Sequence, residues 1–243
     1  MNNYNNEVIY QYEKNNCPFV QERSNLLTKM KLSDLFENKN IYLFSINNDF
    51  TSVATIVKKL IDEQLSSDEE KMFRDWLEGL AIFFNEKVYG GKKSGIKGID
   101  LEFENLNIRN IVSIKYDPNW GNSSQIEEME NNFKAAIKTL RTSNLNLQIK
   151  CINGCCYGKD NNPDKGTYFK YCGQRFWEFI GGNEDIYIDI IEPLRHKAKE
   201  RNEKYMEQYA QMINKFTKEF INLFCGNDGS IDWEKLVKYN SGK

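Results

Sequence analysis

The sequence contains a single histidine, His196, among its 243 residues. Enzymes whose metal sites or catalytic machinery need two or more imidazoles are therefore excluded. Six cysteines are present, but no two of them form a C-x-x-C pair and no histidine lies beside them. A zinc site is accordingly disfavoured, and the cysteines are expected to be buried thiols.

The chain also lacks long apolar runs and Pro-rich or Ser-rich linkers. No segment approaches the roughly 18 consecutive apolar residues of a membrane span. The opening segment MNNYNNEVIYQYEKNN has neither the basic region nor the apolar region of a secretory signal. We therefore expect a cytoplasmic protein with reduced thiols and no membrane contact, folded as a single domain over residues 1–243.

An excess of positive charge is absent as well, since 33 Lys and Arg residues oppose 35 Asp and Glu residues. Composition alone does not indicate nucleic-acid binding, but a local basic patch is sufficient for contact with phosphate. Four lysines with no acid among them lie around the loop GGKKSGIKG, namely Lys87, Lys92, Lys93 and Lys97. Lys92 and Lys93 are the candidates for DNA contact, and a solvated surface loop is the alternative.

Apolar residues recur at helical spacing over residues 26–36, 50–65 and 67–89, and Ser67 with Glu70 forms a capping-box pattern at the start of the third segment. Two short alternating runs, IDLEFE and IVSIK, predict paired strands. An amphipathic helix over 124–141 and a strand over 145–153 follow. The order of helix, strand, strand, helix and strand indicates an α/β or α+β fold, and α/β is the expected class.

Acidic residues alternate along the first of these strands. Residues two apart share one face of a strand, so Asp100, Glu102 and Glu104 are expected to project together, as are Ser113 and Lys115 from the next strand. Carboxylates that converge beside a lysine suit Mg²⁺ and a bound phosphate. From spacing alone, the solvated face of an edge strand is the more common origin of this pattern.

Four segments resemble the PmeII type of type II restriction endonucleases, within the PD-(D/E)XK nuclease superfamily: GIDLEFE, SIKYDPNWGNSSQ, CINGCCYGKD and KYCGQRFWEFIGG. The resemblance extends over about residues 86–205, and PNWGNSSQ is its most specific part. It implies a restriction-endonuclease-like core, with a mixed central sheet flanked by helices, over residues 67–153. Residues 1–66 and 154–243 would then be helical additions.

The resemblance assigns Asp100 as the metal-binding acid and Lys115 as the catalytic lysine. The backbone carbonyl of Ile114 would be a further ligand of Mg²⁺. The position that ordinarily carries a second acid is Ser113, whose hydroxyl group does not have the charge of a carboxylate.

Another carboxylate is therefore expected to complete the site. Glu102 is the first candidate and Glu86, at the end of the preceding helix, is the second, while Glu127 or Glu128 from the following helix is the third. Asp117, two residues after the lysine, is a further departure from the resemblance because it adds an acid close to the site.

The polar segment after the lysine is the expected DNA-binding loop. Its side chains donate and accept hydrogen bonds and precede a helix, an arrangement that suits contact with phosphate or base edges; they are Asn119, Asn122, Ser123, Ser124 and Gln125. The alternative is a turn and a helix cap that contact no ligand. Trp120 is expected to anchor the loop by packing.

The sequence and the resemblance together predict a type II restriction endonuclease, which hydrolyses double-stranded DNA at a short specific sequence and depends on Mg²⁺. A two-fold DNA site implies a homodimer, and a cognate DNA methyltransferase is expected in the same system. A DNA-binding protein on the same fold that does not cleave is the alternative, motivated by Ser113 and Asp117. A soluble interaction protein that binds no DNA is the third interpretation.

Overall fold

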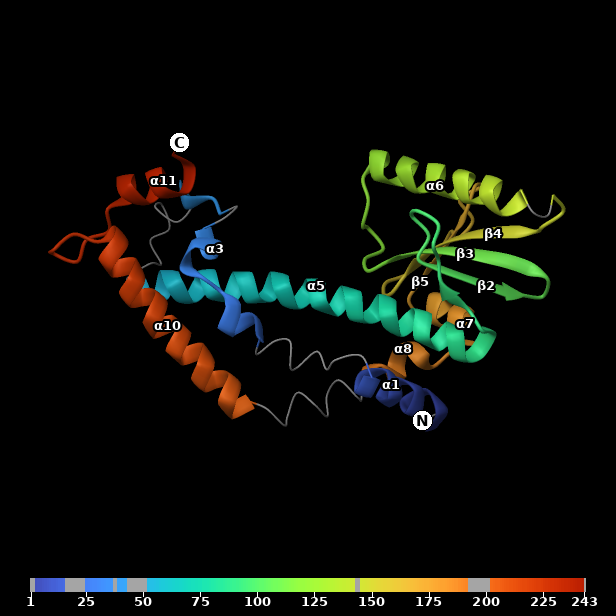
Figure 1. Cartoon of the computed structure of the whole chain (residues 1–243), viewed down its shortest axis with the longest axis horizontal. Coiled ribbons are helices and arrows are strands. Elements are labelled where there is room, and N and C mark those ends of the chain that lie inside the picture. The colour runs from blue at the N-terminus through green and yellow to red at the C-terminus, as the bar shows by residue number, and fades with distance from the viewer. Residues whose placement is uncertain are drawn as a thin grey trace. The chain divides into compact units, whose positions relative to one another are not determined.

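The computed structural model describes residues 3–15, 25–36, 39–42, 52–142, 145–191 and 202–242. Its contacts divide the chain into two compact units (Figure 1). The first unit comprises Met1–Asn16 and Phe73–His196, and the second comprises Cys17–Met72 and Lys197–Lys243. That both units belong to a single domain remains a prediction.

The first unit contains a mixed sheet, whose described strands follow the order β1-β2-β3-β4-β5. The strands are β1 (Lys92–Lys93), β2 (Leu101–Asn105), β3 (Ile108–Lys115), β4 (Ile149–Cys155) and β5 (Phe169–Cys172). β1, β2 and β3 are antiparallel neighbours, whereas β4 runs parallel to both β3 and β5. The predicted pair of strands before the helix is therefore confirmed.

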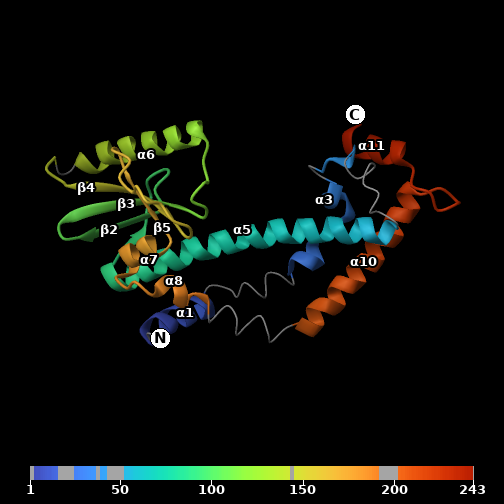
Figure 2. The same cartoon turned by 180° about the vertical axis from the view of Figure 1, so that it is seen from behind.

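Helices cover both faces of this sheet (Figures 1 and 2). α6 (Ser123–Arg141) lies on one face, and α7 (Gln174–Gly181) lies on the other with the C-terminal part of α5 (Val53–Tyr89). The alternation of side chains along β3 explains both layers, because Val112 packs into the cluster below α5 and Ile111 into the cluster below α6. The predicted α/β class, with a mixed sheet flanked by helices, is confirmed.

A glycine in β4 allows α7 to approach the sheet closely. A Cβ atom at Gly154 would lie 2.2 Å from Cε2 of Phe176, which is fully buried on α7. Helices α1 (Asn3–Asn15) and α8 (Ile186–Asp189) belong to the same unit. Nδ2 of Asn5 donates a hydrogen bond of 2.8 Å to the buried carboxylate of Asp189 and so joins these two helices.

The described part of the second unit consists mainly of helices. These are α3 (Leu32–Phe36), the N-terminal part of α5, α10 (Asn202–Phe224) and α11 (Trp233–Ser241). Its core is apolar and aromatic, with Leu35, Phe36, Leu60, Phe216 and Phe220 among its buried side chains. None of the helices in the described residues is long and apolar enough to cross a membrane.

The capping box predicted at Ser67 and Glu70 is wrong, because α5 continues through these residues without interruption. The expected helices over 50–65 and 67–89 are thus one helix. No glycine or proline lies between Val53 and Glu78, so nothing in the sequence ends the helix at the serines.

Gly154→Ala should destabilise the first unit by roughly 1–3 kcal/mol, because the new methyl group overlaps the ring of Phe176. Thermal and urea unfolding, followed by circular dichroism, measure this change. Gly95→Ala is the matched control, since no atom lies within 4 Å of a Cβ atom there. The control should stay within about 0.5 kcal/mol of the unaltered protein. Equal stability of the two variants would contradict the packing described for α7.

Candidate active site

Asp100 lies at the point where β3 extends beyond β2. The strand register pairs Leu101 with Val112, so the last residues of β3 have no partner in β2. Instead, Oδ2 of Asp100 accepts a hydrogen bond of 2.6 Å from the amide of Ile114, and the amide of Asp100 donates one of 2.8 Å to the carbonyl of Val112. The side chain of Asp100 is therefore held against the end of β3.

The carbonyl of Ile114 lies on the same side of β3 as Asp100. In a strand, the amide and carbonyl groups of one residue point toward the same neighbour. Because the amide of Ile114 points to Asp100, its carbonyl oxygen also faces the side on which Asp100 lies. This arrangement is compatible with the metal-ligand role predicted for the Ile114 carbonyl.

Lys115 is the last residue of β3, and its side chain is half-buried. Its Nζ atom lies 5.1 Å from the centroid of the Trp120 ring. No carboxylate of the described residues forms an ion pair with this ammonium group. Its positive charge is therefore not neutralised by a direct contact there and remains available to a phosphate.

Glu78 on α5 is a third charged group of this site, and it was not among the residues predicted from the sequence. Its Oε1 atom lies 3.7 Å from Nζ of Lys93. Burial raises the pKa of Glu78 above its ordinary value of 4.5, the negative charge of Asp100 raises it further, and the positive charges of Lys93 and Lys115 lower it in part. Glu78 is thus electrostatically coupled to both Asp100 and Lys115.

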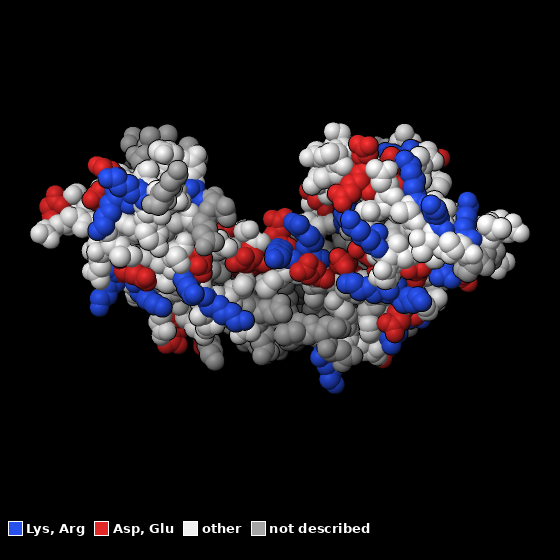
Figure 3. All heavy atoms as spheres, turned by 45° about the horizontal axis from the view of Figure 1, so that its top comes forward, with Lys and Arg blue, Asp and Glu red and all other residues white. Residues whose placement is uncertain are grey.

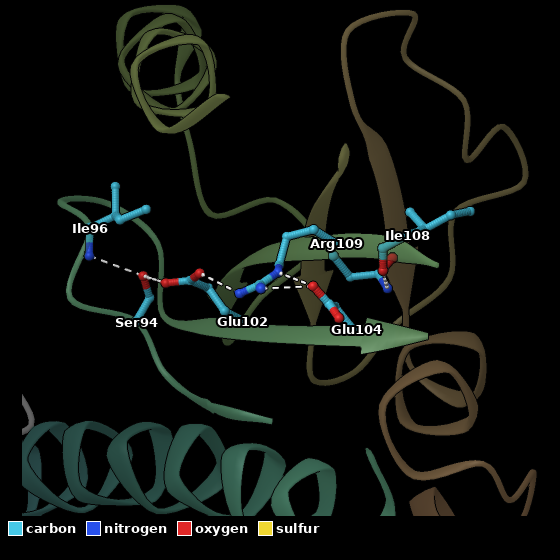
Figure 4. A network of polar contacts seen from close by, with 7 residues as sticks. Ser94, Ile96, Glu102, Glu104, Ile108 and Arg109 are labelled. Carbon is cyan, nitrogen blue, oxygen red and sulfur yellow. Dashed lines mark hydrogen bonds and ion pairs between the residues drawn. The ribbon is translucent and has the colours of Figure 1, made fainter. Parts of the chain in front are cut away.

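Glu102 and Glu104 belong to a separate polar network (Figure 4). Oε1 of Glu102 accepts a hydrogen bond of 2.6 Å from Oγ of Ser94, and its Oε2 lies 3.4 Å from Nη1 of Arg109. Arg109 also donates to Oε1 of Glu104, at 2.8 Å from Nη2 and 3.2 Å from Nε. Both carboxylate oxygens of the buried Glu102 therefore have partners within the protein.

The other candidate carboxylates lie on the helices. Glu86 is exposed on α5, about two turns after Glu78. Glu86, Glu78 and Lys93 all line a depression of about 380 Å³. Glu127 and Glu128 are exposed in the first turns of α6. Glu78 differs in that the charges of Asp100 and Lys115 shift its pKa.

The polar segment after Lys115 forms a turn and a helix cap. Asn122 is the N-cap of α6, and its Oδ1 atom accepts hydrogen bonds from the amide of Gln125 at 3.0 Å and from Oγ of Ser124 at 2.8 Å. Oε1 of Gln125 accepts in return from the amide of Asn122 at 3.0 Å. Oδ1 of Asp117 accepts from the amide of Asn119 at 2.6 Å. Hydrogen bonds within the turn and the helix cap thus give these polar groups partners in the protein. Their role in DNA contact stays a prediction.

These side chains are nevertheless accessible. Asn119, Asn122, Ser123, Ser124 and Gln125 are all exposed, so their outward surfaces can meet a ligand while the cap remains formed. Lys92 and Lys93 are also exposed on β1, at the edge of the sheet. The face shown in Figure 3 carries basic and acidic side chains interspersed over both units.

Trp120 anchors the loop, as expected. Its ring is half-buried against the cluster below α6, and Nε1 donates a hydrogen bond of 3.2 Å to Oδ1 of Asn153. The expectation of buried thiols is likewise confirmed for Cys151, Cys155, Cys156 and Cys172. Burial raises the pKa of Cys151 to about 11 and that of Cys156 to about 12.

Within the described ranges, no group of three or more His, Cys, Asp or Glu side chains is placed to hold a metal ion. Mg²⁺ is commonly bound through one or two carboxylates, with water and substrate phosphate as its other ligands. Asp100, Glu78 and the Ile114 carbonyl supply hard oxygen donors of this kind, so the residues present fit Mg²⁺ rather than zinc.

A family model described as type II restriction endonuclease EcoO109I matches residues 6–202 of the chain. The match extends over well over half of the chain and includes the whole sheet, Asp100, Lys115 and Glu78. No curated protein matches the chain.

In the metal-free protein, the pKa of Glu78 should lie above the ordinary value of 4.5. Asp100→Asn should lower this pKa, because it removes a neighbouring negative charge, and Lys115→Met should raise it, because it removes a positive one. Carbon-13 NMR titration of the side-chain carboxyl groups measures both shifts.

Glu104→Gln serves as the control, since Glu104 interacts with Arg109 and should leave the pKa of Glu78 unchanged. The coupling of Glu78 to Asp100 is refuted by a pKa that is the same before and after Asp100→Asn.

Proposed function

The chain belongs to the EcoO109I family of type II restriction endonucleases, and on this basis we propose that it hydrolyses phosphodiester bonds of double-stranded DNA at a short specific sequence. The observation that carries the proposal is that Asp100 is held against the end of β3, one residue from Lys115, and that the charges of both residues shift the pKa of Glu78. This set of groups suits phosphodiester hydrolysis, since two carboxylates can hold a cation and an ammonium group can neutralise phosphate.

The proposal includes the finer assignment to the PD-(D/E)XK superfamily and to its PmeII type. Two features support this assignment. Asp100 precedes β2 and Lys115 ends β3, with the helix α5 before both, and the segment PNWGNSSQ follows shortly after the lysine. Ser113, the position of the missing acid, is buried within β3. A carboxylate from another element must therefore supply the second negative charge.

We infer that Glu78 supplies it, in place of Glu102 or Glu86. Glu102 already has Ser94 and Arg109 as partners for its two oxygens, and Glu86 lies about two turns further along α5. Asp100, Glu78 and the carbonyl of Ile114 would hold the cation. When bound there, Mg²⁺ would supply positive charge that offsets the negative charge gained by the phosphate during hydrolysis.

The remaining roles follow from the positions of the side chains. The Lys115 ammonium group would orient the scissile phosphate and stabilise the charge that builds up on its oxygens. The DNA backbone beside it would be contacted by the lysines of β1 and by five exposed side chains of the loop, namely Asn119, Asn122, Ser123, Ser124 and Gln125. These contacts would fix the register of the DNA and carry no sequence information themselves.

We further propose a homodimer, because a two-fold DNA site calls for two active centres related by the same symmetry. It would act in the cytoplasm beside a cognate DNA methyltransferase. The alternative, a DNA-binding protein that does not cleave, was motivated by Ser113 and Asp117. Glu78 offers a replacement for the missing acid, and Asp117 accepts a hydrogen bond from the loop backbone, so cleavage is the better-supported function.

Digestion of plasmid DNA with Mg²⁺ tests the proposal. The protein should give discrete fragments, and Asp100→Asn, Lys115→Ala and Glu78→Gln should each lower the cleavage rate by roughly 100-fold or more. DNA binding, measured by gel shift, should persist in all three variants.

Glu86→Gln is the matched control on the same helix and should cleave within about 3-fold of the unaltered protein. Unchanged cleavage in Asp100→Asn and Lys115→Ala would contradict the proposed site. Binding without cleavage by the unaltered protein under every divalent metal would establish the alternative function instead.

A further inference from the structure

The aromatic ring of Trp120 lies directly beneath the ammonium group of Lys115. We propose that Trp120 is a positioning residue for Lys115 and that Asn153 fixes the ring in this place. The inference rests on the proposed function, because it assumes that Lys115 acts on the scissile phosphate. Trp120 would act through the lysine and not on the substrate itself.

The contact is a cation–π interaction. Nζ of Lys115 lies 5.1 Å from the centroid of the Trp120 ring, within the range of about 6 Å over which such contacts are attractive. A lysine side chain has a flexible four-carbon stem, so an ammonium group without a fixed partner occupies many positions. No carboxylate among the described residues pairs with it, and the contact with the ring restricts its position.

The ring is itself held through Asn153, which is only 1% exposed on β4. Oδ1 of Asn153 accepts the hydrogen bond from Nε1 of Trp120, at 3.2 Å, and Nδ2 of Asn153 donates to the carbonyl of Ser113, at 3.4 Å. Ser113 and Asn153 are register partners across the parallel strands. Asn153 therefore connects the tryptophan directly to the strand that ends in the lysine.

The loop that carries Trp120 is fixed at a second point. Gly158, with φ of 83°, leaves room for Pro118, since a Cβ atom there would lie 2.6 Å from Cγ of the proline. Nζ of Lys170 donates a hydrogen bond of 2.7 Å to the carbonyl of Pro118. The ring is thus anchored through its own hydrogen bond to Asn153 and through the backbone two residues before it.

If the Lys115 ammonium group is already positioned before DNA binds, its side chain loses less conformational entropy when the phosphate binds. Catalytic rates fall steeply when a reacting group is displaced by about 1 Å. Removal of the ring should therefore slow the chemical step and leave DNA affinity unchanged. If Trp120 instead stacked on a base, its removal would weaken binding.

The test compares single-turnover cleavage at saturating protein with the Kd for DNA measured by gel shift without divalent metal. Trp120→Leu keeps apolar bulk but removes the ring, and should slow cleavage roughly 3- to 30-fold, the range of factors that a cation–π contact supplies. Its Kd should stay within about 2-fold. Trp120→Phe restores an aromatic face but not the hydrogen bond to Asn153, so it should cleave faster than Trp120→Leu and more slowly than the unaltered protein.

Phe133→Leu is the matched control, because Phe133 belongs to the same buried cluster as Trp120 and loses similar packing without touching Lys115. It should cleave at the rate of the unaltered protein. Asn153→Ala retains the indole side chain but removes the acceptor that fixes its position, and it should slow cleavage with an unchanged Kd. This variant carries the test if Trp120→Leu does not fold.

The inference is overturned if Trp120→Leu cleaves at the unaltered rate, if it weakens DNA binding instead, or if Phe133→Leu slows cleavage equally. The Lys115→Ala variant distinguishes failure of the inference about Trp120 from failure of the proposed function. If Lys115→Ala cleaves normally, the role of the lysine is wrong and the positioning role falls with it. If Lys115→Ala is inactive and Trp120→Leu is fast, only the inference about the tryptophan is wrong.

Discussion

The hydrogen bond from the amide of Ile114 to the carboxylate of Asp100 is the contact on which the rest of the candidate site depends. β3 extends beyond β2, and the buried Ile114 amide would lack a partner in the sheet. A buried amide without a partner is costly, so a side chain must satisfy it. Asp100 does so, and the acid is thereby held one residue from Lys115. Local strand geometry, rather than a long-range contact, brings the acid and the lysine together.

Charges around this contact come from four segments of the first unit. Asp100 precedes β2, Lys115 ends β3, and Glu78 and Lys93 come from α5 and β1. Burial and Asp100 favour the neutral form of Glu78, while the two lysines favour its ionised form. A divalent cation would shift this balance toward the carboxylate and remove the repulsion between the two acids. On the proposed function, these charges would favour cation binding at this place.

Strand alternation and local motifs predicted much of this arrangement. The hairpin, the pairing of Asp100 with the end of β3 and the anchoring role of Trp120 all follow from patterns a few residues long. Glu78 could not be found in this way, because its contact with the site depends on how α5 packs against the sheet. The partners of Glu102 were missed for the same reason, since Arg109 faces it only once β2 and β3 are paired. The pattern at Ser67 and Glu70 wrongly predicted a new helix start. α5 continues through Ser67 because no helix-breaking residue accompanies the pattern.

The central claim is that Asp100, Glu78 and the end of β3 form one cation site. Anomalous scattering from crystals soaked in Mn²⁺ tests it most directly, because Mn²⁺ takes the same hard oxygen ligands as Mg²⁺ and its position can be seen. The account predicts an ion within about 2.5 Å of carboxylate oxygens of Asp100 and Glu78 and of the carbonyl oxygen of Ile114. An ion bound to Glu102 or Glu86, with Glu78 uninvolved, would contradict it.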